Sequence, residues 1–379
     1  MPDPSRGHVA LQRALDRLLA RPAIGHAVLA VESEDGTFRW IGAAGDADGS
    51  GRPMTGQTPF YLASVTKTYT AVLVLRLVEQ GRLELDEPIT SYLPESLTDR
   101  IHVHRGTDHS ARITVRHLLA NTSGLANYFE DRPKGEPSLS TRLFTEGDRS
   151  WSTQDVADML RDQLKPFFPP GRGLRYSDTN FQLIEAIVEH AADAPFHEQL
   201  RAQVLAPLGL SGTYLAGYPP STNSPPPAAL FYRGTVLHMP QAMKSIGAQG
   251  ALISTVEECF TFARALFAGR LFEKAETLAL MMSGWRRFGL PLDAAALRAP
   301  SWPIEYSLGL MRFRLPRLLN GMQPMTPIYG HTGSSGSWLF YAPERGLYFA
   351  GTVDEVTSAA VPYRLVPNLL RQLPADLSA

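Results

Sequence analysis

Two polar residues interrupt a stretch of the sequence that is otherwise apolar. The segment TPFYLASVTKTYTAVLVLRLVEQG, residues 58–81, has apolar residues on almost every side of a helix, and such a helix is normally buried. Ser64 opens this helix, and Lys67 lies about one turn further along the same face. A lysine that faces a core is costly unless it is paired or has a task. The pair therefore indicates a functional site.

A serine beside a lysine is a candidate nucleophile with its base. A serine hydroxyl attacks poorly until a base takes its proton. The free N–H groups and the dipole at a helix start favour the negative charge that develops there. Burial would lower the pKa of Lys67 and help it to accept the proton. About one Ser-x-x-Lys is expected by chance in a chain of this length, so the pair needs support from other segments.

Two further segments carry polar residues at the borders of predicted elements. PGRGLRYSDTNFQLIEAIVEH places Tyr176 and Asp178 in a turn just ahead of a helix. YGHTGSSGSWLFYAP places His331, Thr332 and Gly333 on a strand, and a glycine-serine turn that includes Ser334 follows. The packed phenol and lysine of such a site can share one proton near neutral pH, although each is a weak base at its free pKa.

The remaining pattern predicts strands near both ends of the chain and helices between them. A helix is expected over residues 8–20, and a hairpin turns at Asp35-Gly36 between strands 26–33 and 37–45. Helices dominate residues 86–240, short strands return after residue 300, and a last helix is expected over 357–371. This order indicates an α+β fold, in which one sheet is assembled from both termini around a helical insertion.

Taken in order, the motifs Ser-x-x-Lys, Tyr-Ser-Asp and His-Thr-Gly resemble those of the serine β-lactamase and penicillin-binding-protein superfamily. The second motif resembles the branch that holds class C β-lactamases, D-alanyl-D-alanine carboxypeptidases, D-aminopeptidases and family VIII carboxylesterases. The joining segments GRLELDEPITSYLPE, ITVRHLLANTSGL, LAPLGLSGTYL and GALISTVEECFTF also look like family segments. The resemblance implies the β-lactamase/transpeptidase-like fold, and we expect a sheet domain from residues 1–85 and 241–379, a mainly helical domain from 86–240, and the active site in the cleft between them.

The resemblance also implies a role for each residue of the motifs. Ser64 would be the acylated nucleophile, and Lys67 and Tyr176 would share the role of base, with Tyr176 also passing a proton to the leaving group. The backbone N–H groups of Ser64 and Ser334 would form the oxyanion hole. Asp178 and His331 would face the substrate and the Lys67 ammonium, and Thr332 and Gly333 complete the third motif.

Two positions differ from the commoner family pattern. The second motif more often ends in Asn, whereas here it ends in Asp178. A carboxylate beside Lys67 would favour the charged ammonium, make the lysine a poorer base and shift the burden to Tyr176. The third motif more often begins with Lys, and His331 would anchor a substrate carboxylate less well. Both changes favour small esters over β-lactams and peptidyl-D-Ala-D-Ala.

The bulk composition limits the partners. The 379-residue chain is 44% hydrophobic and 19% charged, with a formal net charge of −1, which is ordinary for a globular protein and offers no basic footprint for nucleic acid or anionic lipid. One cysteine, Cys259, permits no intrachain disulfide, and no signal peptide or membrane span is evident, so we expect a cytoplasmic protein. The expected partner is a small-molecule acyl substrate, with no nucleic acid, membrane, metal or other cofactor involved.

Four alternatives remain open beside an esterase-like serine hydrolase. A D-stereospecific peptidase or amidase would use the same site, and so would an acyltransferase in a biosynthetic pathway, in which a bound alcohol or amine outcompetes water. A β-lactamase and a catalytically silent binding protein are less favoured. The aromatic residues Trp285, Phe288, Trp302 and Trp338 either line an acyl pocket or fill a core. The histidines of the segment IHVHRGTDHSARITVRH are expected in a surface loop rather than at a metal.

Overall fold

The computed structural model describes residues 4–220, 225–289, 303–314 and 325–374. Its helices are α1 (Pro4–Leu19), α2 (Thr66–Glu79), α3 (Glu95–Thr98), α4 (Val115–Leu119), α5 (Leu139–Glu146), α6 (Thr153–Asp162), α7 (Asp178–Ala192), α8 (Phe196–Leu200), α9 (Pro240–Ile246), α10 (Val256–Phe267), α11 (Ala275–Met281) and α12 (Pro362–Gln372). Its strands are β1 (His26–Ser33), β2 (Arg39–Gly45), β3 (Phe60–Tyr61), β4 (Val103–His104), β5 (Thr107–Asp108), β6 (Tyr214–Leu215), β7 (Leu230–Tyr232), β8 (Thr235–Leu237), β9 (Leu252–Ser254), β10 (Arg286–Arg287), β11 (Ile304–Tyr306), β12 (Met311–Phe313), β13 (Ile328–Thr332), β14 (Trp338–Ala342) and β15 (Leu347–Thr352).

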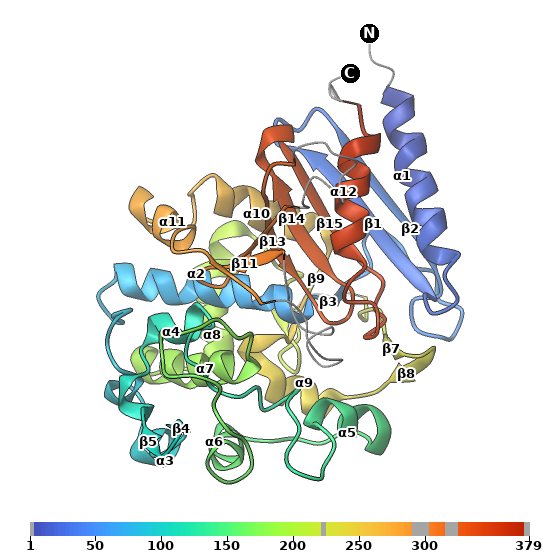
Figure 1. The fold of residues 1–379 in the computed structure, drawn as a ribbon. Helices are drawn as coiled ribbons and strands as arrows, with labels where there is room; N and C mark the ends of the chain where they lie inside the picture. Colours follow the sequence, from blue (N-terminus) through green and yellow to red (C-terminus); the bar gives the residue numbers. More distant parts are fainter. Residues whose placement is uncertain (1–3, 221–224, 290–302, 315–324, 375–379) are drawn as a thin grey trace.

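One antiparallel sheet joins both ends of the described chain. Its strand order is β10-β11-β12-β13-β14-β15-β1-β2, and each strand pairs antiparallel with its neighbours. The N-terminal hairpin β1–β2 thus completes a sheet whose other strands all come from beyond residue 285, as Figure 1 shows. The predicted α+β fold, with a sheet built from both termini, is confirmed.

Burial on both faces explains why β1 reads as a continuous apolar run. Every residue of β1 is buried. Ala27, Leu29 and Val31 belong to the core that includes α1 and α12. Val28 and Ala30 belong to the larger core that includes α10. Helices therefore cover both faces of the sheet, with α1 and α12 together on one of them (Figure 1), and the period-2 alternation of a half-exposed strand is lost.

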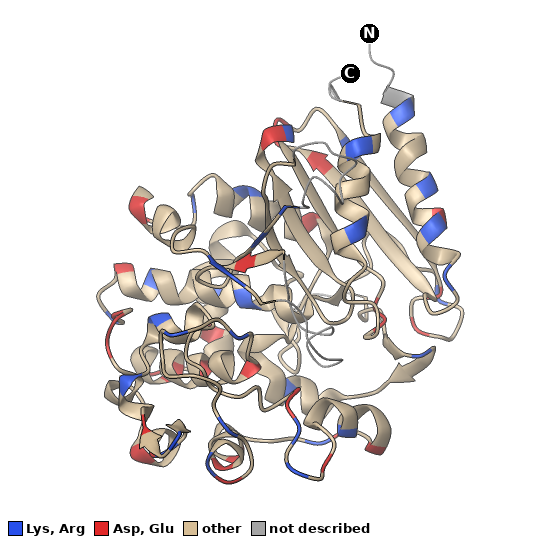
Figure 2. Cartoon of the chain, viewed as in Figure 1, with Lys and Arg blue, Asp and Glu red and all other residues tan. Residues whose placement is uncertain are grey.

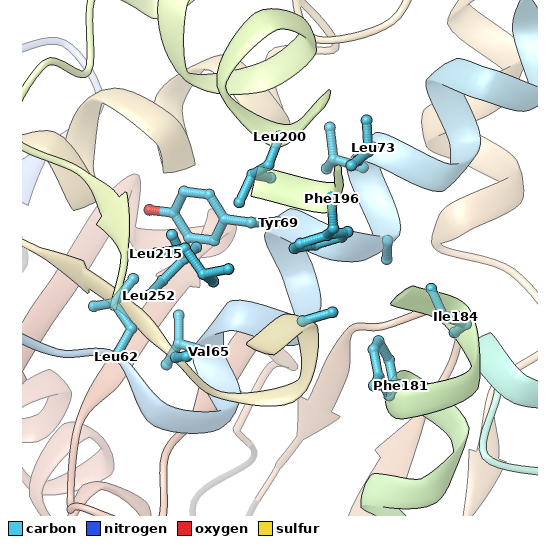
Figure 3. Packing of buried hydrophobic residues seen from close by; sticks show 14 of the residues in the cluster. Leu62, Val65, Tyr69, Leu73, Phe181, Ile184, Phe196, Leu200, Leu215 and Leu252 are labelled. Carbon is cyan, nitrogen blue, oxygen red and sulfur yellow. The ribbon is translucent and has the colours of Figure 1, made fainter. Parts of the chain in front are cut away.

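Helix α2 is buried on nearly every side, as its apolar sequence predicts. Figure 3 shows Tyr69 and Leu73 of α2 surrounded by side chains from α7, α8, β6 and β9, namely Phe181, Ile184, Phe196, Leu200, Leu215 and Leu252. The α-helix begins at Thr66, because residues 63–65 form a 3₁₀ turn. Ser64 therefore lies in the turn that enters the helix rather than in its first α-helical turn.

The two-domain division stays a prediction. The small sheet β3-β9-β6 pairs Tyr214–Leu215, from the predicted helical domain, with Leu252–Ser254, from the predicted sheet domain.

Figure 2 shows acidic and basic residues interspersed over most of the ribbon, whereas the charged residues of α1 and α12 are mostly arginine. None of the described helices is long and apolar enough to cross a membrane.

Candidate active site

The turn that carries Ser64 is clamped by hydrogen bonds from two directions. On one side it is held by β9, since the Leu62 N–H donates to the Leu252 carbonyl at 2.8 Å and the Leu252 N–H donates to the Thr66 hydroxyl at 3.1 Å. On the other side it is held by the turn after β13, where the Ser337 hydroxyl donates to the Leu62 carbonyl at 2.7 Å. These bonds fix the backbone that presents the Ser64 hydroxyl.

Close packing at Gly333 brings the third motif against this turn. A Cβ atom at Gly333 would lie 2.6 Å from the Leu62 carbonyl oxygen and 2.7 Å from Ala63 Cβ, so only glycine fits. Ala63 itself has φ +45°, a left-handed conformation that is uncommon for a residue with a Cβ atom. Strained backbone of this kind persists only where the surroundings hold it, as the clamps on both sides do here.

Lys67 is buried, and its ammonium is saturated with acceptors. Its Nζ donates to Ser64 Oγ at 3.0 Å, to Asp178 Oδ1 at 2.6 Å and to the Gln249 carbonyl at 2.7 Å. Three donors are all that an ammonium has. The rings of Tyr176 and Phe181 lie 5.0 and 5.3 Å from Nζ and add cation–π attraction. This is the geometry of a charged lysine held against a serine hydroxyl.

The pKa of Lys67 nevertheless falls below its ordinary value. Complete burial disfavours the charged ammonium, and the opposing effect of Asp178 does not overcome it. The predicted effect of Asp178 is confirmed in direction, because the carboxylate raises the pKa of Lys67 and favours the ammonium, but burial outweighs it. Lys67 can release a proton at a lower pH than a lysine in water, and its role as the base for Ser64 stays a prediction.

Tyr176 lies beside this pair with a buried hydroxyl. That hydroxyl has no hydrogen-bond partner in the described part of the chain. Burial, with Tyr306 and Asp178, raises the pKa of Tyr176 well above its ordinary value, and only the Ser64 hydroxyl opposes the rise. A phenolate is thus costly here, and the neutral phenol carries a proton that it can donate. The base role predicted for Tyr176 stays a prediction.

His331 is neutral and fully buried behind Tyr176. Its Nδ1 lies 2.7 Å from the Thr332 carbonyl, which can only accept, so Nδ1 carries the proton and Nε2 accepts from the Tyr306 hydroxyl at 3.3 Å. Burial and the Lys67 charge lower the pKa of His331 to about 3. A neutral imidazole offers no charge to a substrate carboxylate, and contact between His331 and substrate stays a prediction.

The structure brings together the residues of all three motifs. Asp178 is the first residue of α7 rather than part of the turn before it, and its carboxylate also accepts from Asn127 Nδ2 at 3.1 Å. The Thr332 hydroxyl pairs with Tyr363 of α12 at 2.8 Å. The hydrogen bonds described for this site include none donated by the Ser64 N–H or the Ser334 N–H, and the oxyanion hole that they would form stays a prediction.

Sequence reasoning missed Asn127, Gln249 and Tyr306. Gln249 acts through its backbone carbonyl, which any residue type would supply, so its identity carries no signal. Asn127 and Tyr306 are ordinary residues far from the motifs in sequence, and only the fold places them against Asp178 and His331.

The other signals of the sequence lie outside this cluster. No group of histidine, cysteine and acidic residues that could hold a metal is found among the residues with described positions. His102 Nε2 pairs with the Phe168 carbonyl. Trp338 is buried in the core of the sheet, Phe288 packs near Tyr176, and Trp302 lies outside the described residues. Burial raises the pKa of the Cys259 thiol to about 12, so this thiol is inert.

Comparison with known proteins defines the class. The family model described as Beta-lactamase matches residues 11–364, and the chain belongs to this family. The chain is similar to the esterase EstB of Burkholderia gladioli, with 35% identity over 53% of this chain and 49% of that protein. It is also similar to penicillin-binding protein 4 of Amycolatopsis lactamdurans, with 26% identity over 98% of this chain and 90% of that protein.

Solved structures agree with this assignment. A D-stereospecific amidohydrolase from Streptomyces sp. has 25% identity and a TM-score of 0.71, with 96% of this chain and 98% of that chain covered. The predicted β-lactamase/transpeptidase-like fold is thereby confirmed. These relatives also support the predicted class of serine hydrolase. The match to EstB spans about half of the length of that protein.

We expect Asp178→Asn to move the acid limb of the pH–rate profile to lower pH. The carboxylate raises the pKa of Lys67 against the effect of burial, so a neutral amide should let that pKa fall further. Activity that needs neutral Lys67 then appears at lower pH. The measurement is kcat/KM for a p-nitrophenyl ester against pH, with Asp86→Asn, a carboxylate that pairs with Arg116 at the surface, as control. An unchanged limb would contradict Lys67 as the titrating base.

His331 should make the fold sensitive to acid. Its pKa is about 3 in the folded protein against 6.5 in the unfolded chain, so below pH 6.5 only the unfolded chain takes up the proton. The stability is complete above pH 6.5 and is lost as the pH falls toward 3, at about 1.4 kcal/mol per pH unit. Urea unfolding at pH 7 and pH 4.5 should show a smaller loss for His331→Gln than for the wild type. Equal losses would contradict the neutral, buried imidazole.

Proposed function

We propose that this protein is a serine hydrolase that cleaves small esters through a covalent acyl-enzyme. One observation carries the proposal: Ser64 Oγ lies 3.0 Å from the nitrogen of a fully buried lysine whose pKa is lowered by that burial. An activated serine beside free backbone N–H groups is what acyl transfer requires. The cytoplasmic location expected from the sequence is kept as part of this proposal.

The reaction would proceed in two steps. Neutral Lys67 takes the Ser64 proton while Oγ attacks the acyl carbon, and the N–H groups of Ser64 and Ser334 stabilise the oxyanion. Tyr176 donates its hydroxyl proton to the leaving alcohol and recovers a proton from the Lys67 ammonium. Water then attacks the acyl-enzyme, with the same groups working in reverse, and Ser64 is released.

The neutral His331 favours an uncharged substrate over one that carries a carboxylate at this position. The third motif contributes no positive charge, because the imidazole is unprotonated above about pH 3. A carboxylate would have to leave water without an ionic partner there, which is costly. This favours esters over β-lactams and over peptides that end in D-alanine.

The second candidate is a D-stereospecific amidase, favoured by the whole-length similarity to the Streptomyces amidohydrolase. A panel separates the candidates: p-nitrophenyl butyrate, D- and L-phenylalanine amide, and nitrocefin, each at equal concentration. Faster turnover of the ester supports the esterase. Faster turnover of the D-amide, with the L-amide untouched, would replace it with the amidase. Adding an alcohol and analysing the products separates both from an acyltransferase.

A further inference from the structure

The Lys67 ammonium depends on a short turn between α9 and β9. This turn, residues 247–249, contributes the Gln249 carbonyl that accepts from Lys67 Nζ at 2.7 Å. The Thr70 hydroxyl, one turn along α2 from Lys67, donates to the Ala248 carbonyl at 2.8 Å. Helix α2 therefore fixes the position of the Gln249 carbonyl relative to Lys67, because the same helix carries Lys67 and binds the turn through Thr70.

A carboxylate on α7 holds the same turn from the other side. Glu185 Oε2 accepts from the Ala248 N–H at 2.7 Å. The fit is close, because a Cβ atom at Gly247 would lie 2.0 Å from that oxygen. Gly247 also has φ +46°, a conformation that glycine adopts at little cost. The turn is thus shaped around the Glu185 carboxylate.

The Glu185 side chain is half-buried at the border of a surface hollow. Burial raises its pKa to about 8, with Glu189 adding to the rise and the Ala248 N–H opposing it. Two other ionisable groups lie near Glu185 in the described residues. Lys244 lines the same surface hollow, and the Glu185 charge contributes to the raised pKa of Tyr128. An apolar side chain would leave the Ala248 N–H without this acceptor, so the polar side chain of Glu185 serves the turn.

We propose that Glu185 is a positioning residue for Lys67: it holds the turn 247–249 in the orientation in which the Gln249 carbonyl accepts the lysine ammonium. The inference rests on the role proposed for Lys67. Displacing the turn removes one of the two other acceptors that hold the nitrogen 3.0 Å from Ser64 Oγ. A shift of about 1 Å in a reacting group can lower the rate about 100-fold.

Two substitutions separate positioning from general stability. Glu185→Leu removes the acceptor and should lower kcat about tenfold or more per active site, with little change in KM. It should also move the acid limb to lower pH, because the ammonium loses an acceptor. Glu185→Gln keeps an acceptor for the Ala248 N–H and should restore most of kcat. In the wild type, kcat should increase near pH 8 as Glu185 ionises, because the charged carboxylate binds the Ala248 N–H more tightly. Glu185→Gln should lack this increase in kcat.

A matched control exists on α10. Glu258 is likewise half-buried and accepts a backbone N–H, that of Gly212 at 2.8 Å, away from Lys67. Glu258→Leu should cost stability without changing kcat or the acid limb. The same kinetic effect from Glu258→Leu as from Glu185→Leu would overturn the proposal, and so would an unchanged kcat in Glu185→Leu.

A readout independent of turnover keeps this inference distinct from the proposed function. The Lys67 titration, followed by ¹³C NMR of lysine-labelled protein, should shift to lower pH in Glu185→Leu but not in Glu258→Leu. Should Glu185→Leu fail to fold, Thr70→Val loosens the same turn from α2 and should shift the titration in the same direction. An unshifted titration would overturn the inference, whatever the enzyme hydrolyses. An inactive wild type with a shifted titration would overturn only the proposed function.

Discussion

Ser64→Ala should lower kcat by a factor on the order of 10⁴ or more, while the fold stays intact. Removing the nucleophile of a serine hydrolase removes the acyl-enzyme itself, and only the oxyanion hole and substrate binding remain. The change removes one oxygen atom and the hydrogen bond described between Ser64 and Lys67, so little packing is lost. The measurement is intact-protein mass after brief exposure to p-nitrophenyl butyrate, with nitrophenolate release followed in parallel.

The wild type should show one added butyryl group and a burst of nitrophenolate, and both should vanish in Ser64→Ala. Ser211→Ala, a change at an exposed serine, is the control and should leave both signals unchanged. A butyryl adduct that persists in Ser64→Ala would place the nucleophile elsewhere. A wild type without adduct or release would mean that the acyl donor is more specialised than this ester, and a wider donor screen would follow.

Lys67→Met is expected to affect both activity and stability. Losing a positioned base typically lowers the rate about 10²- to 10⁴-fold. The variant also leaves the Asp178 carboxylate buried without its cation, since Asn127 remains its other described partner. Breaking one side of a buried ion pair costs about 3–5 kcal/mol of the free energy of unfolding. Urea unfolding at pH 7 measures this cost, and kcat/KM for the ester measures the first effect.

The double variant Lys67→Met/Asp178→Asn separates the two effects. A neutral amide at position 178 removes the unpaired charge, so most of the lost stability should return, whereas activity should stay low because the base is still absent. Recovery of activity together with stability would show that Lys67 serves the fold alone. Stability that does not recover would show that the loss comes from packing of the lysine stem rather than from the stranded carboxylate.

Local patterns predicted much of the fold because local physics decides them. The hairpin β1–β2 follows from apolar strands on either side of Asp35-Gly36, and Gly36 has φ +72°, which the turn requires. The buried helix α2 follows from its continuous apolar surface. Helix ends were less accurate: the last helix runs over Pro362–Gln372 rather than 357–371, since Pro362 suits the first turn of a helix.

The sequence by itself predicted the motif residues of the candidate site, because the three motifs combine residue types whose chemistry is recognisable without coordinates. Only the tertiary structure decided the burial, the hydrogen-bond partners and the pKa shifts of those residues. Two pKa directions illustrate this: the sequence sets Asp178 beside Lys67, but complete burial outweighs that charge, and the same burial raises the pKa of Tyr176. The carbonyl of Gln249 and the carboxylate of Glu185 are also invisible in the sequence. Burial and backbone contacts depend on segments distant in the chain, and they exist only once the fold has brought those segments together.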